Sequence, residues 1–136
     1  MVFVYFPIVT TIGLSTFNGC SSLESVDFPL VTSIGNYAFS SCSSLVLVDF
    51  PLVTNIGSYV FKNCFSLVTA DFPLVTNIGS YAFEKCFLGS ISFGTAFIEE
   101  TNIIFDTDIF YDTFTENIDL TLGEYVLPLP ELTNNT

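Results

Sequence analysis

The cysteines are the most reactive side chains of this 136-residue sequence, because a thiolate can bind a metal ion, attack an electrophile or form a disulfide. They recur at intervals of 22 residues, at Cys20, Cys42, Cys64 and Cys86. Zinc sites use ligands paired closely in sequence, and the chain has no histidine, so this spacing excludes a zinc site. Thiols packed in a core and disulfides between neighbouring repeats remain as alternatives, of which we favour the first. The cysteines therefore do not decide the redox compartment.

A second column with the same spacing consists of the acids Asp27, Asp49 and Asp71. If equivalent residues stack about 5 Å apart, neighbouring carboxylates repel each other by roughly 0.8 kcal/mol in water. The middle carboxyl, Asp49, is then expected to be the hardest to ionise. The row could attract a basic partner or a cation, or it could be a solvated face that discourages unwanted sheet pairing.

No catalytic set emerges from the remaining residues. There is no histidine to act as a general base and no glycine-rich phosphate loop, so we predict that the chain is not an enzyme. Four acids of the C-terminal segment have a spacing that is superficially like a calcium loop, but the glycine expected at its sixth position is Tyr111 and its twelfth residue is Asn117. We expect no cofactor and no metal, with a weak divalent site as the alternative at Asp106, Asp108, Asp112 and Glu116.

The composition limits the possible partners and the location of the chain. With 2 basic and 14 acidic residues the net charge is -12, which would repel nucleic acid. Nine of the acids lie in residues 98–136, which contain no base, so we predict a boundary near residue 97. There is no apolar run long enough to predict a transmembrane segment, and the apolar start lacks the flanks of a signal peptide. We interpret that start as a strand.

The columns belong to a repeat of 22 residues. A unit this short cannot bury its own apolar face, so copies must stack, and the stack is a solenoid with an open side. The anchor residues are Pro7, Pro29, Pro51 and Pro73; Gly13, Gly35, Gly57 and Gly79; Phe17, Phe39, Phe61 and Phe83; and the four cysteines.

Each repeat contains signals for local structure. Alternation over residues 23–28 predicts a short strand with Val26 and Phe28 inward, ended by a proline. Gly35 predicts a turn with a backbone conformation closed to other residues. Residues 37–42 are interpreted as a short helical turn. Residues 1–97 would form four coils, and residues 98–136 a degenerate fifth coil and acidic cap, with a final strand at 118–122 and no regular structure beyond Gly123.

The run Ile34-Gly35-x-x-Ala38-Phe39-x-x-Cys42-Ser43-Ser44-Leu45-x-x-Val48-x-Phe50-Pro51 resembles the BspA-type leucine-rich repeat of bacterial surface proteins. The resemblance implies a right-handed leucine-rich-repeat solenoid with a parallel sheet on its concave face and short helical turns on the convex side. It also implies a secreted or cell-surface module of the adhesion type that binds host, matrix or neighbouring-cell proteins through the sheet.

The candidate binding residues are the outward positions of the predicted strands. An apolar start on that face could mark a binding surface or the absence of preceding coils. The predicted residues are Phe3, Tyr5, Ser25, Asp27, Leu47, Asp49, Thr69, Asp71, Ser90 and Ser92.

Two other functions remain open. In one, the chain is a structural spacer or a self-assembling array whose uncapped first strand associates end to end with a copy of itself. In the other, it is a cation-dependent glycan binder that uses the acid column and a tyrosine column at Tyr37, Tyr59 and Tyr81, although stacking for stability is the favoured interpretation of those tyrosines.

Overall fold

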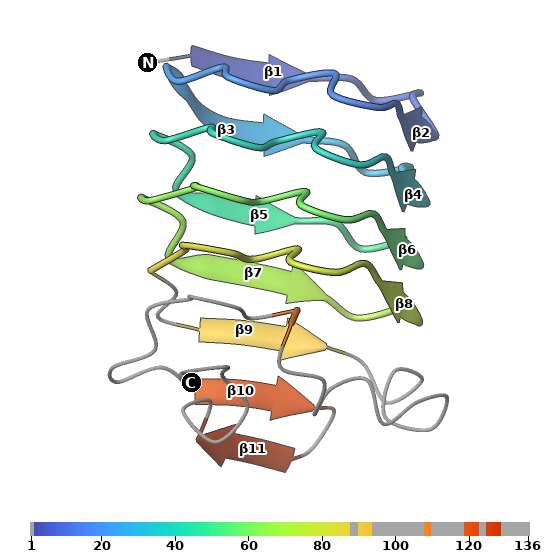
Figure 1. Ribbon diagram of the computed structural model, residues 1–136. Helices are drawn as coiled ribbons and strands as arrows, with labels where there is room; N and C mark the ends of the chain where they lie inside the picture. Colours follow the sequence, from blue (N-terminus) through green and yellow to red (C-terminus); the bar gives the residue numbers. More distant parts are fainter. Residues whose placement is uncertain (1, 88–89, 94–107, 110–118, 123–124, 129–136) are drawn as a thin grey trace.

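The computed structural model describes residues 2–87, 90–93, 108–109, 119–122 and 125–128. The chain winds into coils that stack directly on one another, and the first four coils each have one longer and one two-residue strand (Figure 1). This arrangement is the solenoid predicted from the repeat. The described residues contain no helix, so the helical turns expected on the convex side are wrong.

The longer strands form a seven-stranded sheet in the order β1-β3-β5-β7-β9-β10-β11. Neighbours pair in parallel from β1 to β10, whereas β11 pairs antiparallel with β10. The strands are β1 (Val2–Tyr5), β3 (Leu23–Asp27), β5 (Leu47–Asp49), β7 (Thr69–Phe72), β9 (Ser90–Phe93), β10 (Asp119–Leu122) and β11 (Tyr125–Pro128). The predicted inward positions of β3 are confirmed, since Val26 is buried while Asp27 is exposed.

A second, four-stranded parallel sheet lies on another side of each coil and was not expected from the sequence. Its strands, in order, are β2 (Thr11–Ile12), β4 (Ser33–Ile34), β6 (Asn55–Ile56) and β8 (Asn77–Ile78). The isoleucines are buried, and the outward asparagines form their own ladder, in which Asn77 Nδ2 donates to Asn55 Oδ1 at 2.8 Å. Two-residue strands are too short to show the alternation that identifies a strand in a sequence.

The segment from Tyr37 to Cys42 forms a series of tight turns where a helical turn was predicted. Every second N–H group, starting at Ala38, donates to the carbonyl three residues back at 3.1 to 3.2 Å. The intervening groups bond to the next coil, as Phe39 N does to Val60 O at 3.0 Å. An α-helix would need all of these groups for bonds within the segment. Tyr37 and Ser41 have φ values of 61°, outside the helical region.

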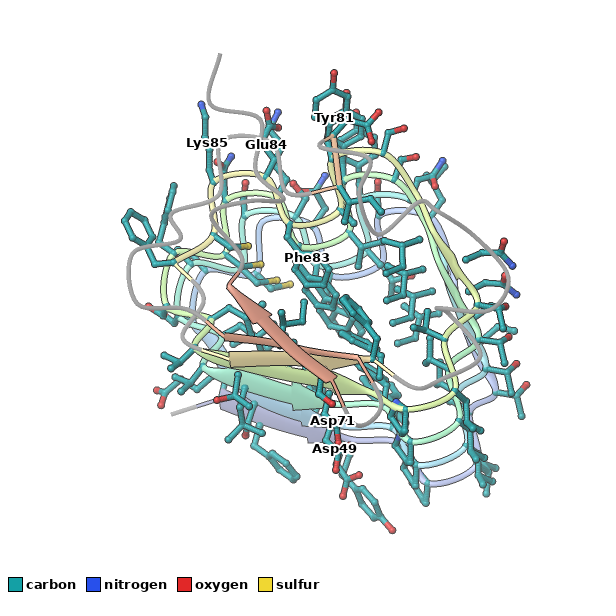
Figure 2. The ribbon with its side chains drawn as sticks, turned by 90° about the horizontal axis from the view of Figure 1, so that it is seen from below. Asp49, Asp71, Tyr81, Phe83, Glu84 and Lys85 are labelled. Carbon is teal, nitrogen blue, oxygen red and sulfur yellow. The ribbon has the colours of Figure 1, made fainter. Side chains whose placement is uncertain are left out.

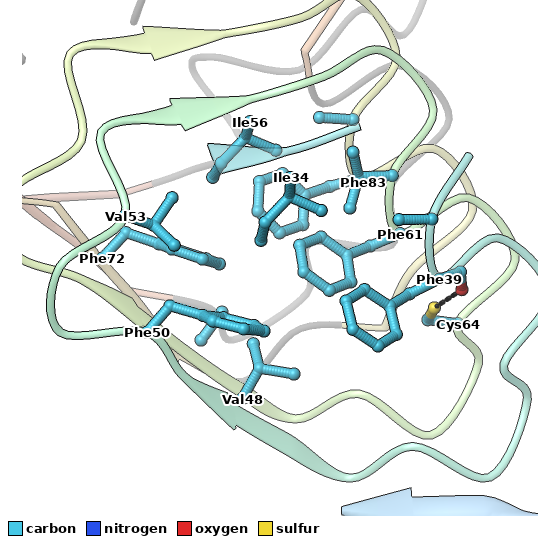
Figure 3. Close-up of a cluster of buried hydrophobic side chains, with 14 of the residues drawn as sticks. Ile34, Phe39, Val48, Phe50, Val53, Ile56, Phe61, Cys64, Phe72 and Phe83 are labelled. Carbon is cyan, nitrogen blue, oxygen red and sulfur yellow. Dashed lines mark hydrogen bonds between the residues drawn. The ribbon is translucent and has the colours of Figure 1, made fainter. Parts of the chain in front are cut away.

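Two rows of phenylalanine rings fill the core (Figure 3). Along each row, neighbouring ring planes are within 21° of parallel, and centroids are 5.3 to 6.4 Å apart. One row is Phe6, Phe28, Phe50, Phe72 and Phe93, and the other is Phe17, Phe39, Phe61 and Phe83. Contacts of this kind add about 0.5 to 1.5 kcal/mol per pair beyond burial, so the rows hold successive coils in register.

The cysteines also lie in one row, as the 22-residue spacing predicted, and all four thiols are free. Figure 2 shows the sulfur atoms side by side along the stack. The three buried thiols each donate to the carbonyl 25 residues earlier: Cys42 Sγ to Phe17 O at 3.2 Å, Cys64 Sγ to Phe39 O at 3.1 Å and Cys86 Sγ to Phe61 O at 3.0 Å. Cysteine at these three positions therefore fills a small core site and satisfies a carbonyl of the preceding coil.

The anchor glycines Gly35, Gly57 and Gly79 are explained by close approach between coils and not by backbone conformation. Gly19 alone among the described glycines has a positive φ, so the special turn predicted at Gly35 is wrong. A Cβ at Gly35 would lie 2.7 Å from Leu14 N, and one at Gly57 would lie 2.8 Å from Asn36 N. A side chain here would therefore force neighbouring coils apart.

The C-terminal part departs from the 22-residue interval. Strand β10 confirms the strand predicted at 118–122, whereas β11 contradicts the expectation of no regular structure beyond Gly123. Tyr59 N donates to Ser80 O, and one coil later Tyr81 N donates to Asp108 O at 2.9 Å. Asp108 therefore takes the position equivalent to Ser80 after 28 residues instead of 22. Ile109 is buried beside it, at 1% exposure. The predicted boundary at residue 97 and the rest of the degenerate coil lie outside the described residues.

Candidate binding face

The ten residues predicted from the sequence all lie on strands of the seven-stranded sheet. The strand registers align them in two columns across β1, β3, β5, β7 and β9. One column is Phe3, Ser25, Leu47, Thr69 and Ser90. In the other, Tyr5 is paired with Asp27, and Asp49 with Asp71 and Ser92, while Asp27 and Asp49 each lie two residues beyond the Ser25–Leu47 pair. We call the surface formed by these ten positions the outer face.

The outer face changes in character along the stack. Phe3 and Tyr5 are each 54% exposed and Leu47 is 50% exposed, whereas Ser25 and Ser92 are half-buried. Figure 2 shows Asp49 and Asp71 projecting from the sheet away from the core. The face thus runs from aromatic at β1, through carboxylates at the middle strands, to a hydroxyl at β9.

The electrostatics of the face centre on Asp71. Burial, and then the negative charge of Asp49, raise the pKa of the Asp71 carboxyl, while a hydrogen bond with Ser92 opposes that rise. Because the raised pKa means that ionisation of the Asp71 carboxyl is disfavoured, a positively charged group placed over it would stabilise the ionised form. The expectation from the sequence considered only the charges of neighbouring aspartates, whereas burial is the larger cause of the raised pKa of Asp71.

The sequence reasoning missed a row of leucines at the end of the strands. Leu30, Leu52 and Leu74 follow the repeat prolines and are 43%, 38% and 47% exposed. The signal was present in the repeat, because an outward leucine precedes a buried valine, Val31, Val53 or Val75, in each copy.

A second apolar group was also missed, at the start of the strands. Val46 and Val68 are 43% and 48% exposed and lie in adjacent coils, since Val68 N donates to Val46 O at 2.8 Å. Phe65 and Phe87 are 49% and 48% exposed, with ring centroids 6.2 Å apart. Serines occupy the positions equivalent to the two phenylalanines in the earlier coils, Ser21 and Ser43, so the aromatic part of this patch belongs to the later coils alone. Apolar side chains therefore lie at both ends of β5 and β7, which carry Asp49 and Asp71.

The tyrosine column lies on the opposite side of the coil from the aspartates (Figure 2). Tyr37, Tyr59 and Tyr81 stack with centroids 4.8 and 5.1 Å apart, so each inner ring face is covered by the next tyrosine. Lys62 Nζ lies 5.4 Å from the Tyr59 centroid and 3.6 Å from Glu84 Oε1. The acid and tyrosine columns, on which the glycan alternative rested, therefore do not form one site.

The inner thiols are not suited to nucleophilic chemistry. Burial is the main cause that raises the pKa of Cys42 to about 12, and burial also raises the pKa of Cys64 and Cys86. A nucleophilic cysteine needs the opposite shift, since the thiolate is the reactive form.

Two observations concern ions and membranes. Within the described ranges, no three acidic, cysteine or histidine residues gather closely enough to hold a metal ion. Of the four acids compared with a calcium loop, Asp106, Asp112 and Glu116 lie outside the described residues. The described residues also include no helix with the length and apolar character needed to cross a bilayer.

Comparison with known proteins supports the repeat assignment. The BspA type Leucine rich repeat region matches residues 3–115 in six copies. A solved leucine-rich repeat protein from Bacteroides ovatus aligns with 90% of this chain at 29% identity and a TM-score of 0.66. The alignment covers 30% of that protein's chain, so the present chain spans less than a third of its length. No curated protein matches the sequence.

Proposed function

The chain belongs to the BspA-type leucine-rich repeat family, and from that premise we propose that it is a non-enzymatic binding module for other proteins. The partner would be bound across the outer face. The observation that carries this proposal is the alignment of the ten positions in two columns over five strands.

The physical support comes from the openness and the chemistry of that face. A solenoid exposes a long surface without an enclosed cleft, which suits a macromolecule better than a small substrate. Carboxylates at Asp27, Asp49 and Asp71 favour a partner with basic side chains, and the leucine and valine rows on either side supply apolar contact. We propose a protein surface that combines basic and apolar residues.

The place of action follows from the family and is part of the proposal. Family members resemble surface proteins of bacteria, so we propose a secreted or surface-attached location, where host, matrix or neighbouring-cell proteins are accessible. A surface role of the adhesion type agrees with the strongly acidic composition, which disfavours non-specific binding to nucleic acid.

The proposal is tested by capture of proteins from matrix and epithelial extracts on the immobilised chain, followed by affinity measurement with each captured protein. The variant Asp27→Asn, Asp49→Asn, Asp71→Asn should weaken binding by about tenfold or more, because charged pairs set partner choice and association rate.

A matched control removes three charges elsewhere. The variant Glu99→Gln, Glu100→Gln, Glu131→Gln has the same net charge as the triple aspartate variant, and its affinity should stay close to that of the original chain. Equal binding by all three proteins would remove the aspartates from the site. An equal loss in both variants would show that the overall field, and not the outer face, attracts the partner.

A further inference from the structure

Three rows of side chains lie side by side where strands β3, β5 and β7 end. In each repeat an aspartate is followed by a buried phenylalanine, then by a proline at least partly exposed and a leucine that is 38% to 47% exposed. The three strands lie between β1 and β9, so neighbouring coils flank the rows on both sides. We call this surface the acid–leucine strip. Its residues are Asp27, Asp49 and Asp71; Pro29, Pro51 and Pro73; and Leu30, Leu52 and Leu74.

The acid–leucine strip presents side chains and no open strand edge. Each of β3, β5 and β7 is hydrogen-bonded to a strand on either side, and the prolines have no N–H group to donate. A partner therefore cannot bind here by adding a strand. Its own backbone groups, once covered by prolines and leucines, must find their hydrogen bonds within the partner. An α-helix meets that requirement, because its N–H and C=O groups pair with each other.

The dimensions of the strip also match a helix that lies along the stack axis. The rows repeat about every 4.8 Å, the spacing of neighbouring strands, and a helical turn rises about 5.4 Å. Across three coils the two distances differ by about 1.2 Å, which long side chains can absorb. Asp49 and Leu52 are three residues apart, or at most about 11 Å of chain, and a helix is about 10 to 12 Å wide. Such a helix would cover the prolines, with carboxylates along one flank and leucines along the other.

Charge indicates which helix suits this strip. The chain contains two bases, Lys62 and Lys85, and neither belongs to the strip. Lys62 Nζ lies 3.6 Å from Glu84 Oε1, and Figure 2 shows Lys85 on the far side of the coil from Asp49. The strip therefore combines a negative row with an apolar row. The complementary surface has basic side chains on one flank and apolar side chains on the other, which is an amphipathic pattern.

We propose that the partner of this chain is bound through a basic amphipathic α-helix that lies along the acid–leucine strip. Its lysine or arginine side chains pair with Asp27, Asp49 and Asp71, and its apolar side chains pack on Leu30, Leu52 and Leu74. Helices are recognised in this way through apolar residues spaced three and four positions apart. The inference rests on the proposed function, because it names the element that the binding module recognises.

The test uses the unmodified chain and three synthetic alanine-based peptides of about 18 residues. The first has leucines at positions i, i+4, i+7 and i+11 with arginines along one flank. The second has the same composition in an order that gives neither stripe, and the third is the first with two central alanines replaced by proline, which breaks the helix. Fluorescence anisotropy measures affinity, and circular dichroism measures helix content. The first peptide should bind at least about tenfold more tightly than the other two and gain helix on binding.

Matched variants of the chain locate the contact. Leu52→Gln, Leu74→Gln should weaken binding of the first peptide by about tenfold, because two apolar contacts of the strip are lost. The control, Val46→Gln, Val68→Gln, changes two residues of the same two coils that are 43% and 48% exposed, compared with 38% and 47% for the leucines. These valines lie beyond the aspartates and outside the strip, so the control should bind the first peptide like the unmodified chain.

Three results would overturn the inference. Equal binding of the first two peptides would show attraction by charge alone, and binding of the proline peptide as tight as that of the first would show recognition of an extended segment. An equal loss in the leucine and valine variants would place the contact outside the strip. Capture from extracts that depends on the aspartates, together with no binding of the first peptide, would leave the proposed function standing and remove the helix. Loss of that capture would remove the proposed function itself.

Discussion

The first coil and the inner coils carry the same repeat, yet equivalent residues differ in environment. Phe17 is partly buried while Phe39 and Phe61 are 0% exposed, and Cys20 is exposed while Cys42 and Cys64 are 0% exposed. Local sequence is nearly the same in each copy, so the neighbouring coil produces the burial. Stability in such a stack is a sum of weak units and stronger contacts between units.

The largest expected difference between the two regions is at the inner phenylalanine row. Phe61→Ala removes a ring packed between two others and should lower the free energy of unfolding by about 3 to 5 kcal/mol. Phe17→Ala, in the first coil, removes a half-buried ring that has a row neighbour on one side, and should cost about 1 to 2 kcal/mol. Urea unfolding of both variants measures the two values. Equal losses would show that the first coil is as well packed as the inner coils.

The repeat glycines give the next largest difference. Gly57→Ala places a methyl group 2.8 Å from Asn36 N and should destabilise the fold by about 1 to 3 kcal/mol. Gly13→Ala, in the first coil, meets nothing closer than Thr16 Oγ1 at 3.6 Å and should change stability by less than about 0.5 kcal/mol. Thermal unfolding of the two alanine variants measures the two changes in stability. A loss at Gly13 as large as that at Gly57 would contradict the assignment of these glycines to close approach between coils.

Thiol reactivity measures the same contrast without a mutation. In dilute protein at pH 8, one thiol, Cys20, should react rapidly with a disulfide reagent, while Cys42, Cys64 and Cys86 should react only after unfolding. The inner thiols are buried, and the pKa of Cys42 is raised to about 12, so thiolate is scarce at that pH. If more than one thiol per folded chain reacted rapidly with the reagent, the packing described for Cys42, Cys64 and Cys86 would be wrong.

The smallest expected effect concerns the aspartates. The pKa of Asp71 is raised above its ordinary value of 3.8, so ionisation costs stability as pH rises through the folded-state pKa. Asp71→Asn should therefore stabilise the fold at pH 7 by a few tenths of a kcal/mol, since solvent screens much of the repulsion. The gain should vanish below about pH 3.8, where the carboxyl is protonated in both states.

The control for this change is Asp27→Asn, on the exposed aspartate beside the first coil. It should alter stability less than Asp71→Asn at pH 7, and urea midpoints at pH 7 and pH 3 provide the comparison. A gain from Asp71→Asn that persists at pH 3 would exclude the charge as its cause.

Much of the fold and of the outer face could be predicted from the repeat. The 22-residue interval aligned the cysteines and phenylalanines in rows, and the alternation over 23–28 assigned Val26 inward and Asp27 outward. The ten residues of the outer face followed from that alternation, and the strand registers confirm their shared columns. The leucine and valine rows beside them lie just outside the strands, where the alternation that assigns inward and outward positions does not apply.

The sequence by itself determined that copies stack and which side chains face inward, because a 22-residue unit has no other way to bury Val26, Phe28 or Phe39. The tertiary structure decided which hydrogen-bond partners the backbone groups between those buried residues have. N–H groups of residues 37–42 are divided between local turns and the next coil, which excludes the expected helical turn. The same stacking decided that Gly57 is needed for spacing and that Ile109 completes a coil after a longer interval. These outcomes depend on the neighbouring coil, whose position a single repeat does not contain.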